Sequence, residues 1–258
     1  MAILESKKVT KRFGGLEAVS KIDLEVKEGA IYSIIGPNGA GKTTFFNCVT
    51  GFYTPEEGEI LLSSRNITGL SPDRVTRLGI SRTYQNIRLF KNMTAVENIL
   101  VGMQPHLKSG LFGGIFHDPR TMKEEKDAVE EAKRLLVFIN LKGKGDLMAK
   151  NLPYGEQRRL EIGRALASKP KLLLLDEPTA GMNPSETQDM VNFIRRLRDE
   201  LGITILLIEH RMDMVARLCD HVVVLAEGRR LAEGPFDEIA ANPVVQEAYM
   251  GRRRETVA

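Results

Sequence analysis

The strongest constraint on the fold is a short glycine-rich segment at residues 36–43, which reads GPNGAGKT. It satisfies the pattern G-x-x-x-x-G-K-[ST], in which backbone N–H groups curl around phosphate oxygens in conformations that a Cβ would block. Residues 30–35 before it are typical of a buried strand, and residues 45–49 begin an apolar helix. This strand–loop–helix context favours a phosphate-binding loop in an α/β fold over a glycine-rich turn without a ligand.

The residue types in this segment suit a bound nucleotide. We expect Lys42, as an exposed loop lysine, to reach the outer phosphates, and the Thr43 hydroxyl to hold Mg²⁺. The helix that follows points the positive end of its dipole at the same anion. The predicted phosphate loop, residues 36–44, comprises Gly36, Pro37, Asn38, Gly39, Ala40, Gly41, Lys42, Thr43 and Thr44.

A second motif lies at residues 171–178, which read KLLLLDEP. Four leucines followed by two acids predict a buried parallel strand whose carboxylates emerge at its C-terminal edge, where ligands bind in α/β sheets. Asp176 would complete the Mg²⁺ shell with Thr43. Glu177 would polarise a water against the γ-phosphate, a general-base role that contributes roughly 10²–10⁴ in rate. Two solvated acids at a strand end are a common alternative, and the pairing with the phosphate loop favours hydrolysis.

Between these motifs, residues 151–167 read NLPYGEQRRLEIGRALA. Together with the phosphate loop, the acid pair and His210, this segment resembles that of ABC-type ATPases, and the resemblance covers nearly the whole chain. It implies an α/β P-loop NTPase with a RecA-like core, an antiparallel β subdomain and an α-helical subdomain at about residues 86–164. Residues 1–258 would then form a single ABC ATPase domain.

The same resemblance assigns further site residues. Phe13 would stack on adenine, a contact of roughly 1–3 kcal/mol, Gln85 would sense Mg²⁺ and water, and His210 would sense the γ-phosphate. Taken singly, Phe13 could be a core residue, Gln85 a polar residue at the end of a strand, and His210 a helix cap. Residues 180–183 would form a loop between subunits. The residues that would meet the ATP of a second subunit, here called the signature segment, are Leu152, Pro153, Tyr154, Gly155 and Glu156.

This signature segment departs from the family pattern Leu-Ser-Gly-Gly-Gln. Pro153 replaces a serine that would donate to the γ-phosphate, and proline has no donor. A hydrogen bond to a charged group contributes on the order of 1.5–3 kcal/mol, so we expect a weaker contact in trans, with the Gly155 N–H still available. Asn183, in place of the usual aspartate, still offers a side chain for helix capping.

Several segments narrow the resemblance to the ATP-binding subunits of bacterial branched-chain amino-acid importers. They are the insertion QPHLKSGLFGGIFHDPR at residues 104–120, the stretch at residues 82–90, the run YGEQRRLEI and the ending NPVVQEAYMG. The resemblance implies a homodimer or a heterodimer with a paralogue, integral membrane permease subunits, an indirect link to a substrate-binding protein, and a peripheral place on the cytoplasmic face of the inner membrane. An ABC ATPase for lipid or lipopolysaccharide transport and a soluble, non-transport ABC ATPase remain alternatives.

A transport motor also needs a groove for the helices of its membrane subunits. Apolar residues just after Gln85 are the candidates for this groove, with core packing as their alternative role: Ile87, Leu89, Phe90 and Met93.

Composition agrees with a cytosolic enzyme. A chain of 258 residues with 42% hydrophobic content can bury a large core, and its net charge of +3 gives no reason to expect a nucleic-acid partner. Cys48 and Cys219 offer no disulfide framework, and the charged N-terminus is unlike a signal peptide. Apolar runs such as residues 203–208 fall far short of the ~20 residues that a membrane span needs.

Overall fold

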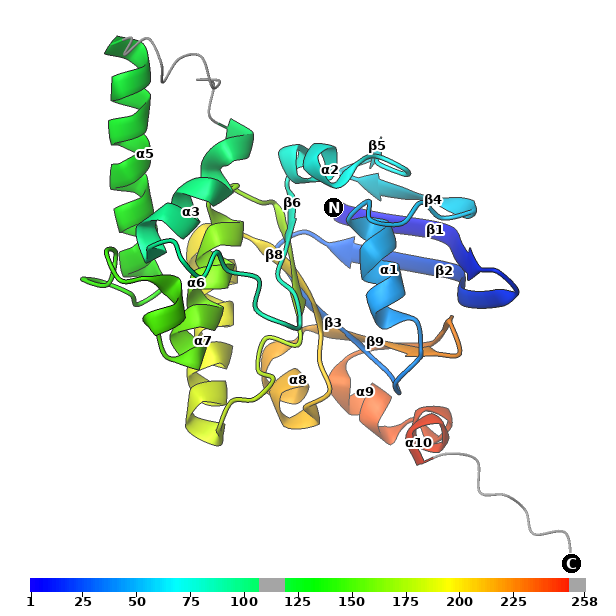
Figure 1. The fold of residues 1–258 in the computed structure, drawn as a ribbon. Helices are drawn as coiled ribbons and strands as arrows, with labels where there is room; N and C mark the ends of the chain where they lie inside the picture. The colour runs from blue at the N-terminus through cyan, green and yellow to red at the C-terminus, as the bar shows by residue number, and fades with distance from the viewer. Residues whose placement is uncertain (107–118, 251–258) are drawn as a thin grey trace, which may run out of the picture.

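The computed structural model describes residues 1–106 and 119–250, and every structural statement below refers to these residues. Its strands form a six-stranded sheet and a four-stranded sheet, and helices cover both faces of the larger one (Figure 1). Most of the insertion at residues 104–120 and the basic run at residues 252–254 lie outside the described residues.

The six-stranded sheet has the order β10-β9-β3-β8-β7-β6, and its strands are parallel except for β10 at one edge. Every residue of β3, β7 and β8 is buried, as expected for apolar runs inside a parallel sheet. Because these three strands are neighbours, the segments that follow them meet at one edge. The strands are β3 (Ile31–Ile35), β6 (Ile80–Arg82), β7 (Leu172–Asp176), β8 (Thr204–Ile208), β9 (His221–Ala226) and β10 (Arg229–Gly234).

The four-stranded sheet is antiparallel, with the order β2-β1-β4-β5, and it is the antiparallel β subdomain that the resemblance implies. Alternate residues of β2 are buried, among them Ile22, Leu24 and Val26. They share an apolar cluster with Phe45 and Phe46 of α1 (Lys42–Val49) and with one face of the larger sheet. The strands are β1 (Ala2–Phe13), β2 (Leu16–Lys27), β4 (Glu57–Leu62) and β5 (Arg65–Asn66).

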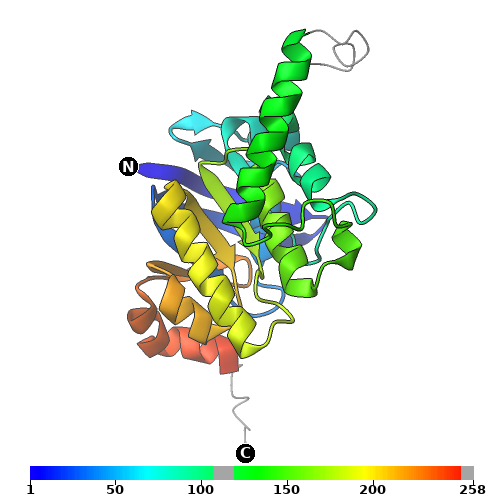
Figure 2. The same ribbon diagram turned by 90° about the vertical axis from the view of Figure 1, so that its left-hand side faces the viewer.

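A group of helices lies beside the sheets, and α5 projects away from the rest of the molecule (Figures 1 and 2). Thr94 and Glu97 form a capping box at the start of α3. Apolar residues at helical spacing between positions 128 and 139 are buried, with Leu135 packed at the margin of their cluster. The elements are α3 (Ala95–Met103), the 3₁₀ turns η1 (Gln104–His106) and η2 (Ala149–Asn151), α5 (Pro119–Phe138) and α6 (Tyr154–Leu166).

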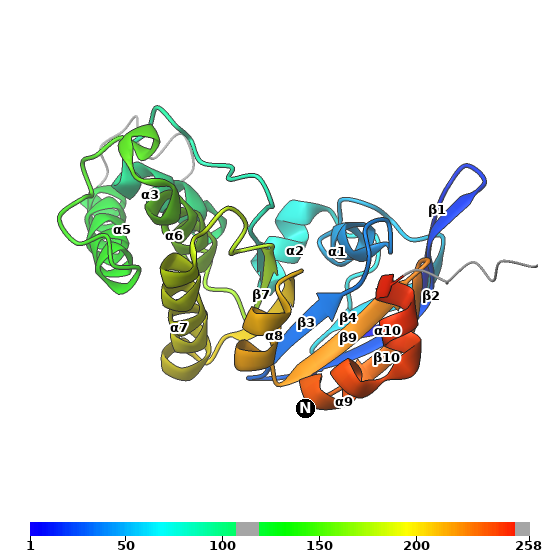
Figure 3. The same cartoon turned by 90° about the horizontal axis from the view of Figure 1, so that it is seen from below.

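One apolar cluster joins these helices to α7 (Pro184–Leu201) and to the second face of the larger sheet. Leu173 and Leu175 of β7 face this cluster, whereas Leu172 and Leu174 face the cluster that contains α1. Figure 3 shows α6 and α7 side by side, away from α1. The sheet therefore separates two apolar layers, and its C-terminal edge lies between them.

The remaining helices are short: α2 (Pro72–Leu78), α8 (Met212–Leu218), α9 (Phe236–Ala241) and α10 (Pro243–Met250). In the described parts of the chain, no helix combines the length and apolar character needed to cross a bilayer. Both cysteines are free, and burial raises the pKa of the Cys48 thiol to about 12, as expected for a packing residue.

Candidate nucleotide-binding and catalytic site

The phosphate loop connects β3 to α1, and glycine is required at two of its positions. A Cβ on Gly36, at φ +147°, would lie 2.0 Å from Leu225 O, and one on Gly41, at φ +92°, would lie 2.3 Å from Ala18 O. No side chain in the described parts of the chain caps the first turn of α1. Its N–H groups therefore have no partner within the helix and can bind an anion, which is the fit that a nucleotide phosphate requires.

Lys42 is buried, with 6% of its surface exposed, so the expectation of an exposed loop lysine is wrong. Its Nζ donates to Gly36 O at 2.7 Å and to Pro37 O at 2.9 Å, which holds the ammonium inside the curve of the loop. Burial lowers the Lys42 pKa, and the carboxylates of Glu177 and Asp176 act in the opposite direction. The loop thus carries a lysine that already helps to set its conformation.

Asp176 ends β7 and is almost fully buried. Its Oδ2 accepts a hydrogen bond from Arg82 Nη2 at 2.6 Å, while Arg82 Nη1 donates to Asn47 Oδ1 at 2.6 Å. The guanidinium also lies over the rings of Phe46 and Tyr84, at 5.4 and 5.1 Å from their centroids. Sequence reasoning missed Arg82, because no motif marks an arginine at the end of an edge strand.

Glu177 follows Asp176 and is held by the two other predicted catalytic residues. Its Oε2 accepts from Gln85 Nε2 at 2.9 Å, and its Oε1 lies 2.8 Å from His210 Nε2. The backbone of Glu177 is left-handed, at φ +47°, a conformation that costs a non-glycine residue about 1–3 kcal/mol. The structure therefore brings Gln85, Glu177 and His210 together, with the Glu177 carboxylate oriented from both sides.

The three residues predicted to hold a metal line one cavity of about 350 Å³. They are Thr43, Gln85 and Asp176, and their hydroxyl, amide and carboxylate oxygens are hard ligands of the kind that Mg²⁺ prefers. The ion pair with Arg82 uses Oδ2 of Asp176. The residues present therefore fit a hydrated Mg²⁺ ion.

Phe13 ends β1 and is 43% exposed, so it is not a core residue. Its ring packs edge-on against Tyr53, with the centroids 5.2 Å apart, and Lys11 Nζ lies 5.4 Å from the Phe13 centroid. An exposed aromatic ring is therefore available for a nucleobase. Tyr53 and Lys11 lie against this ring, and sequence reasoning did not identify either residue.

The signature segment forms the start of α6. Pro153 is the N-cap residue and contributes no side-chain hydrogen bond, while Tyr154 is 47% exposed. Glu156 accepts from Lys144 Nζ at 2.6 and 2.7 Å. In Figures 1 and 3, α6 lies in the helical part of the molecule, away from α1 and the phosphate loop. Within one chain, the signature segment lies apart from the phosphate loop and is connected to Gln85 through Arg158, whose Nη2 donates to both Tyr154 Oη and Gln85 O.

The loop of residues 180–183 leads into α7. Asn183 Oδ1 accepts from Glu186 N at 2.9 Å, and Glu186 Oε2 accepts from Asn183 N at 2.9 Å. This capping box confirms that Asn183 caps the helix as predicted.

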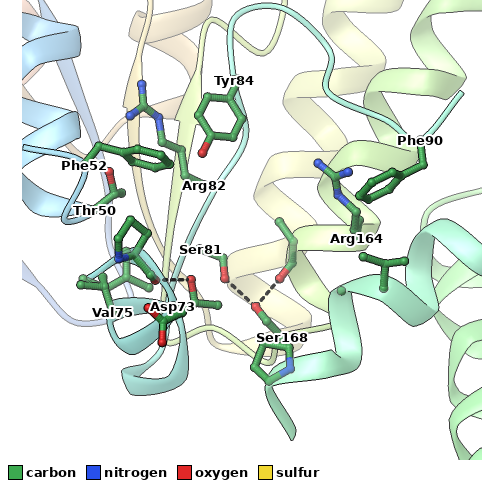
Figure 4. A pocket seen from close by; sticks show the side chains of 17 residues that line it. Thr50, Phe52, Asp73, Val75, Ser81, Arg82, Tyr84, Phe90, Arg164 and Ser168 are labelled. Carbon is green, nitrogen blue, oxygen red and sulfur yellow. Dashed lines mark hydrogen bonds between the residues drawn. The ribbon is translucent and has the colours of Figure 1, made fainter. Parts of the chain in front are cut away.

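A second cavity, of about 410 Å³, lies between β6, α2, α3 and α6 (Figure 4). Phe90 lines it, is 45% exposed, and packs its ring against the guanidinium of Arg164. Of the other residues expected in a groove, Met93 is exposed, Ile87 is half-buried and Leu89 packs against the helical cluster. Leu89 thus has the core role that was its alternative.

Comparison with known proteins agrees with this geometry. Residues 19–180 match a family described as ABC transporter, and residues 229–255 match one described as branched-chain amino acid ATP-binding cassette transporter. The high-affinity branched-chain amino acid transport ATP-binding protein BraF of Pseudomonas aeruginosa is 48% identical over 249 residues, which is 96% of this chain and 98% of BraF.

Two solved structures resemble the fold over most of its length. The ADP conformation of an ATP-binding cassette of an ABC transporter gives a TM-score of 0.85 at 36% identity, covering 97% of this chain and 99% of that one. A dimeric bacterial ABC transporter cassette gives 0.76 at 25% identity, covering 90% and 98%. The chain therefore belongs to the ABC transporter family, as one of its ATP-binding cassettes.

Proposed function

We propose that this chain is the ATP-hydrolysing subunit of an importer of branched-chain amino acids. The observation that carries the hydrolytic role is the carboxylate of Glu177, held between Gln85 and His210 beside the phosphate loop. The relation to BraF and the family match at residues 229–255 support the cargo. Residues 1–258 act as a single ABC ATPase domain, with a helical subdomain at about residues 86–164.

Binding of MgATP uses groups that converge at the C-terminal edge of the sheet. The N–H groups at the start of α1 and the ammonium of Lys42 hold the phosphates, and the exposed ring of Phe13 stacks on adenine. Thr43, Gln85 and Asp176 hold Mg²⁺, which when bound neutralises charge on the β- and γ-phosphates.

Hydrolysis needs a water aligned with the γ-phosphate and a base for its proton. The Glu177 carboxylate takes that proton as the water oxygen bonds to phosphorus and the bond to ADP breaks. Its two hydrogen bonds, from Gln85 and His210, fix its orientation. General-base catalysis by a side chain positioned in this way contributes roughly 10²–10⁴ in rate.

The signature segment acts in trans. Because α6 starts away from α1 in the same chain, its residues 152–156 complete the site of a second subunit, which is another copy of this chain or a paralogue. The resemblance to a dimeric cassette supports this arrangement. Two subunits facing head-to-tail then enclose two MgATP, and their closure drives transport.

Permease subunits dock at the cavity between β6, α2, α3 and α6. It is large enough for apolar side chains of a cytoplasmic helix, and Phe90 offers an exposed anchor at its wall. The ATPase is then peripheral, on the cytoplasmic face of a bacterial inner membrane, and a substrate-binding protein acts on it only through the permease.

The test is Glu177→Gln. The variant should bind MgATP as the parent does, lose turnover by about two orders of magnitude or more, and form an ATP-dependent dimer in light scattering. Glu200→Gln, on the exposed surface of α7, is the matched control and should keep parent turnover. Normal hydrolysis by Glu177→Gln would refute its role as the base. Co-purification of the parent with its membrane subunits, followed by uptake assays with branched-chain amino acids, tests the cargo.

A further inference from the structure

We propose that Arg158 and Glu161 are positioning residues that link the two ATP sites of the dimer. In this proposal they tie the signature segment of each chain to its own glutamine loop, defined as residues 84–88. Occupancy of the partner's ATP site, sensed at the signature segment, then adjusts the base of the chain's own site. The inference rests on the proposed dimer and goes beyond it by naming the residues that couple its sites.

Arg158 and Glu161 form an ion pair that is removed from water. Arg158 Nη1 lies 2.9 Å from Glu161 Oε2, and the two side chains are 0% and 1% exposed. At positions i and i+3 of α6 they share one face of the helix. A buried ion pair is favourable only when further hydrogen bonds satisfy its remaining donors and acceptors.

Most of those further hydrogen bonds go to the main chain of the glutamine loop, while Arg158 Nε has no partner among the described residues. Arg158 Nη1 donates to Tyr84 O at 2.6 Å, and Nη2 donates to Gln85 O at 2.7 Å. Glu161 Oε1 accepts from Arg88 N at 2.9 Å. Three main-chain groups of a five-residue loop are thus bound by two side chains of α6, so the loop follows that helix when it moves.

The same guanidinium reaches the signature segment. Arg158 Nη2 donates to Tyr154 Oη at 3.4 Å. The Tyr154 ring also lies beside Gly181. A Cβ added to that glycine would be 3.7 Å from the nearest ring carbon. Arg158 therefore contacts the helix start that is proposed to meet the partner's ATP.

The other end of the connection is the catalytic base. Gln85 is held by its main-chain oxygen to Arg158 and by its side-chain amide to Glu177, at 2.9 Å. One residue thus joins α6 to the group that activates water. The resulting series of contacts runs from Tyr154 through Arg158 and Gln85 to Glu177, and every step is a hydrogen bond.

Arg158→Lys is the principal variant. A lysine keeps the charge beside Glu161, but its single ammonium cannot reproduce the fork that binds two carbonyls. Nucleotide affinity of the variant should stay within about threefold of the parent, since the phosphate loop is unaltered. Turnover per bound nucleotide should fall by about 5- to 150-fold, the usual range of a coupling between sites. The Hill coefficient for ATP should fall to about 1.

Leu136→Ala is the control for a merely structural role. Leu136 is buried in the helical cluster and has no polar side-chain atom with which to hold the glutamine loop. Its truncation should lower thermal stability and leave the Hill coefficient and the turnover per bound nucleotide unchanged. If Arg158→Lys fails to fold, Glu161→Gln decides: its amide oxygen still accepts from Arg88 N, the ion pair is lost, and the Hill coefficient should fall in the same way.

Parent-like cooperativity in the folded Arg158 or Glu161 variant overturns the inference. So does a Hill coefficient of 1 in an unaltered chain that hydrolyses ATP and dimerises. These results leave the proposed function in place, whereas an unaltered chain that neither hydrolyses ATP nor dimerises refutes the proposed function itself.

Discussion

Replacing Arg82 by methionine should strongly destabilise the nucleotide-free cassette. The Arg82 and Asp176 side chains are 4% and 5% exposed, and the ion pair between them is 2.6 Å long. Methionine fills much of the space but leaves Asp176 as a buried carboxylate without its cation, and Asn47 Oδ1 without its donor. Breaking a buried pair in this way costs about 3–5 kcal/mol. At 2–4 °C per kcal/mol for a chain of this size, Tm should fall by roughly 6–20 °C.

Arg196→Met is the matched control. Arg196 and Glu200 form a bond of 2.8 Å on α7, but their side chains are 38% and 51% exposed. An exposed pair at this spacing contributes about 0.3–0.5 kcal/mol, so Tm should fall by no more than about 2 °C. The two ion pairs have similar bond lengths, so the comparison contrasts a buried pair with an exposed one.

The assay is thermal unfolding with divalent metal chelated, repeated with saturating MgATP. Since Mg²⁺ at the proposed site puts a cation beside Asp176, MgATP should stabilise Arg82→Met by more than it stabilises the parent. The double variant Arg82→Met/Asp176→Asn should regain part of the lost stability, because its buried amide carries no charge. The reasoning is refuted if Arg82→Met lowers Tm no more than Arg196→Met does.

Three further results are expected. Lys42→Ala should reduce MgATP binding and turnover below detection and also cost roughly 1–3 kcal/mol of stability, since its ammonium bonds two loop carbonyls; hydrolysis at the parent rate would contradict the loop assignment. Pro153→Ser should strengthen ATP-driven dimerisation, followed by light scattering, by a few-fold to about a hundredfold, and no change would mean that the backbone already supplies the contact. Phe90→Glu should leave ATPase activity of the isolated subunit near normal and abolish uptake by the assembled transporter; normal uptake would place the coupling surface elsewhere.

The sequence predicted the parts of this molecule that local patterns determine. The apolar run before Asp176 predicts a buried strand, and Asn183 caps the start of a helix as expected. The three residues assigned to catalysis meet in space because the segments that carry them are ordered by one sheet edge, which the parallel-strand pattern anticipates.

Contacts between segments far apart in the sequence could not be predicted from local patterns. Arg82 and Asp176 are separated by 94 positions, and Arg158 and Tyr84 by 74. In the sequence, Arg158 and Glu161 have the spacing of an ordinary solvent-exposed helix pair. Their burial results from packing α6 against the glutamine loop, and no local pattern encodes that packing. The same holds for Lys42, whose motif indicates its charge but not that the loop folds around it.

The phosphate loop packs against Ala18 and the β9–β10 turn, and these contacts decide how variants of this cassette are interpreted and where it can be labelled. The carbonyl of Ala18 lies 2.3 Å from where a Cβ on Gly41 would be, and 2.9 Å from where one on Gly228 would be. Gly228 N also donates to Ala40 O at 3.2 Å. A natural polymorphism or an inserted tag in the β9–β10 turn therefore disturbs the phosphate loop, which lies almost 190 positions earlier in the chain. Residue 228 nevertheless belongs to no nucleotide-binding motif. At Gly202, in the turn after α7, an added Cβ meets nothing within 4 Å, but the backbone φ of +66° favours glycine, so a reporter suits this turn only as an insertion that keeps Gly202.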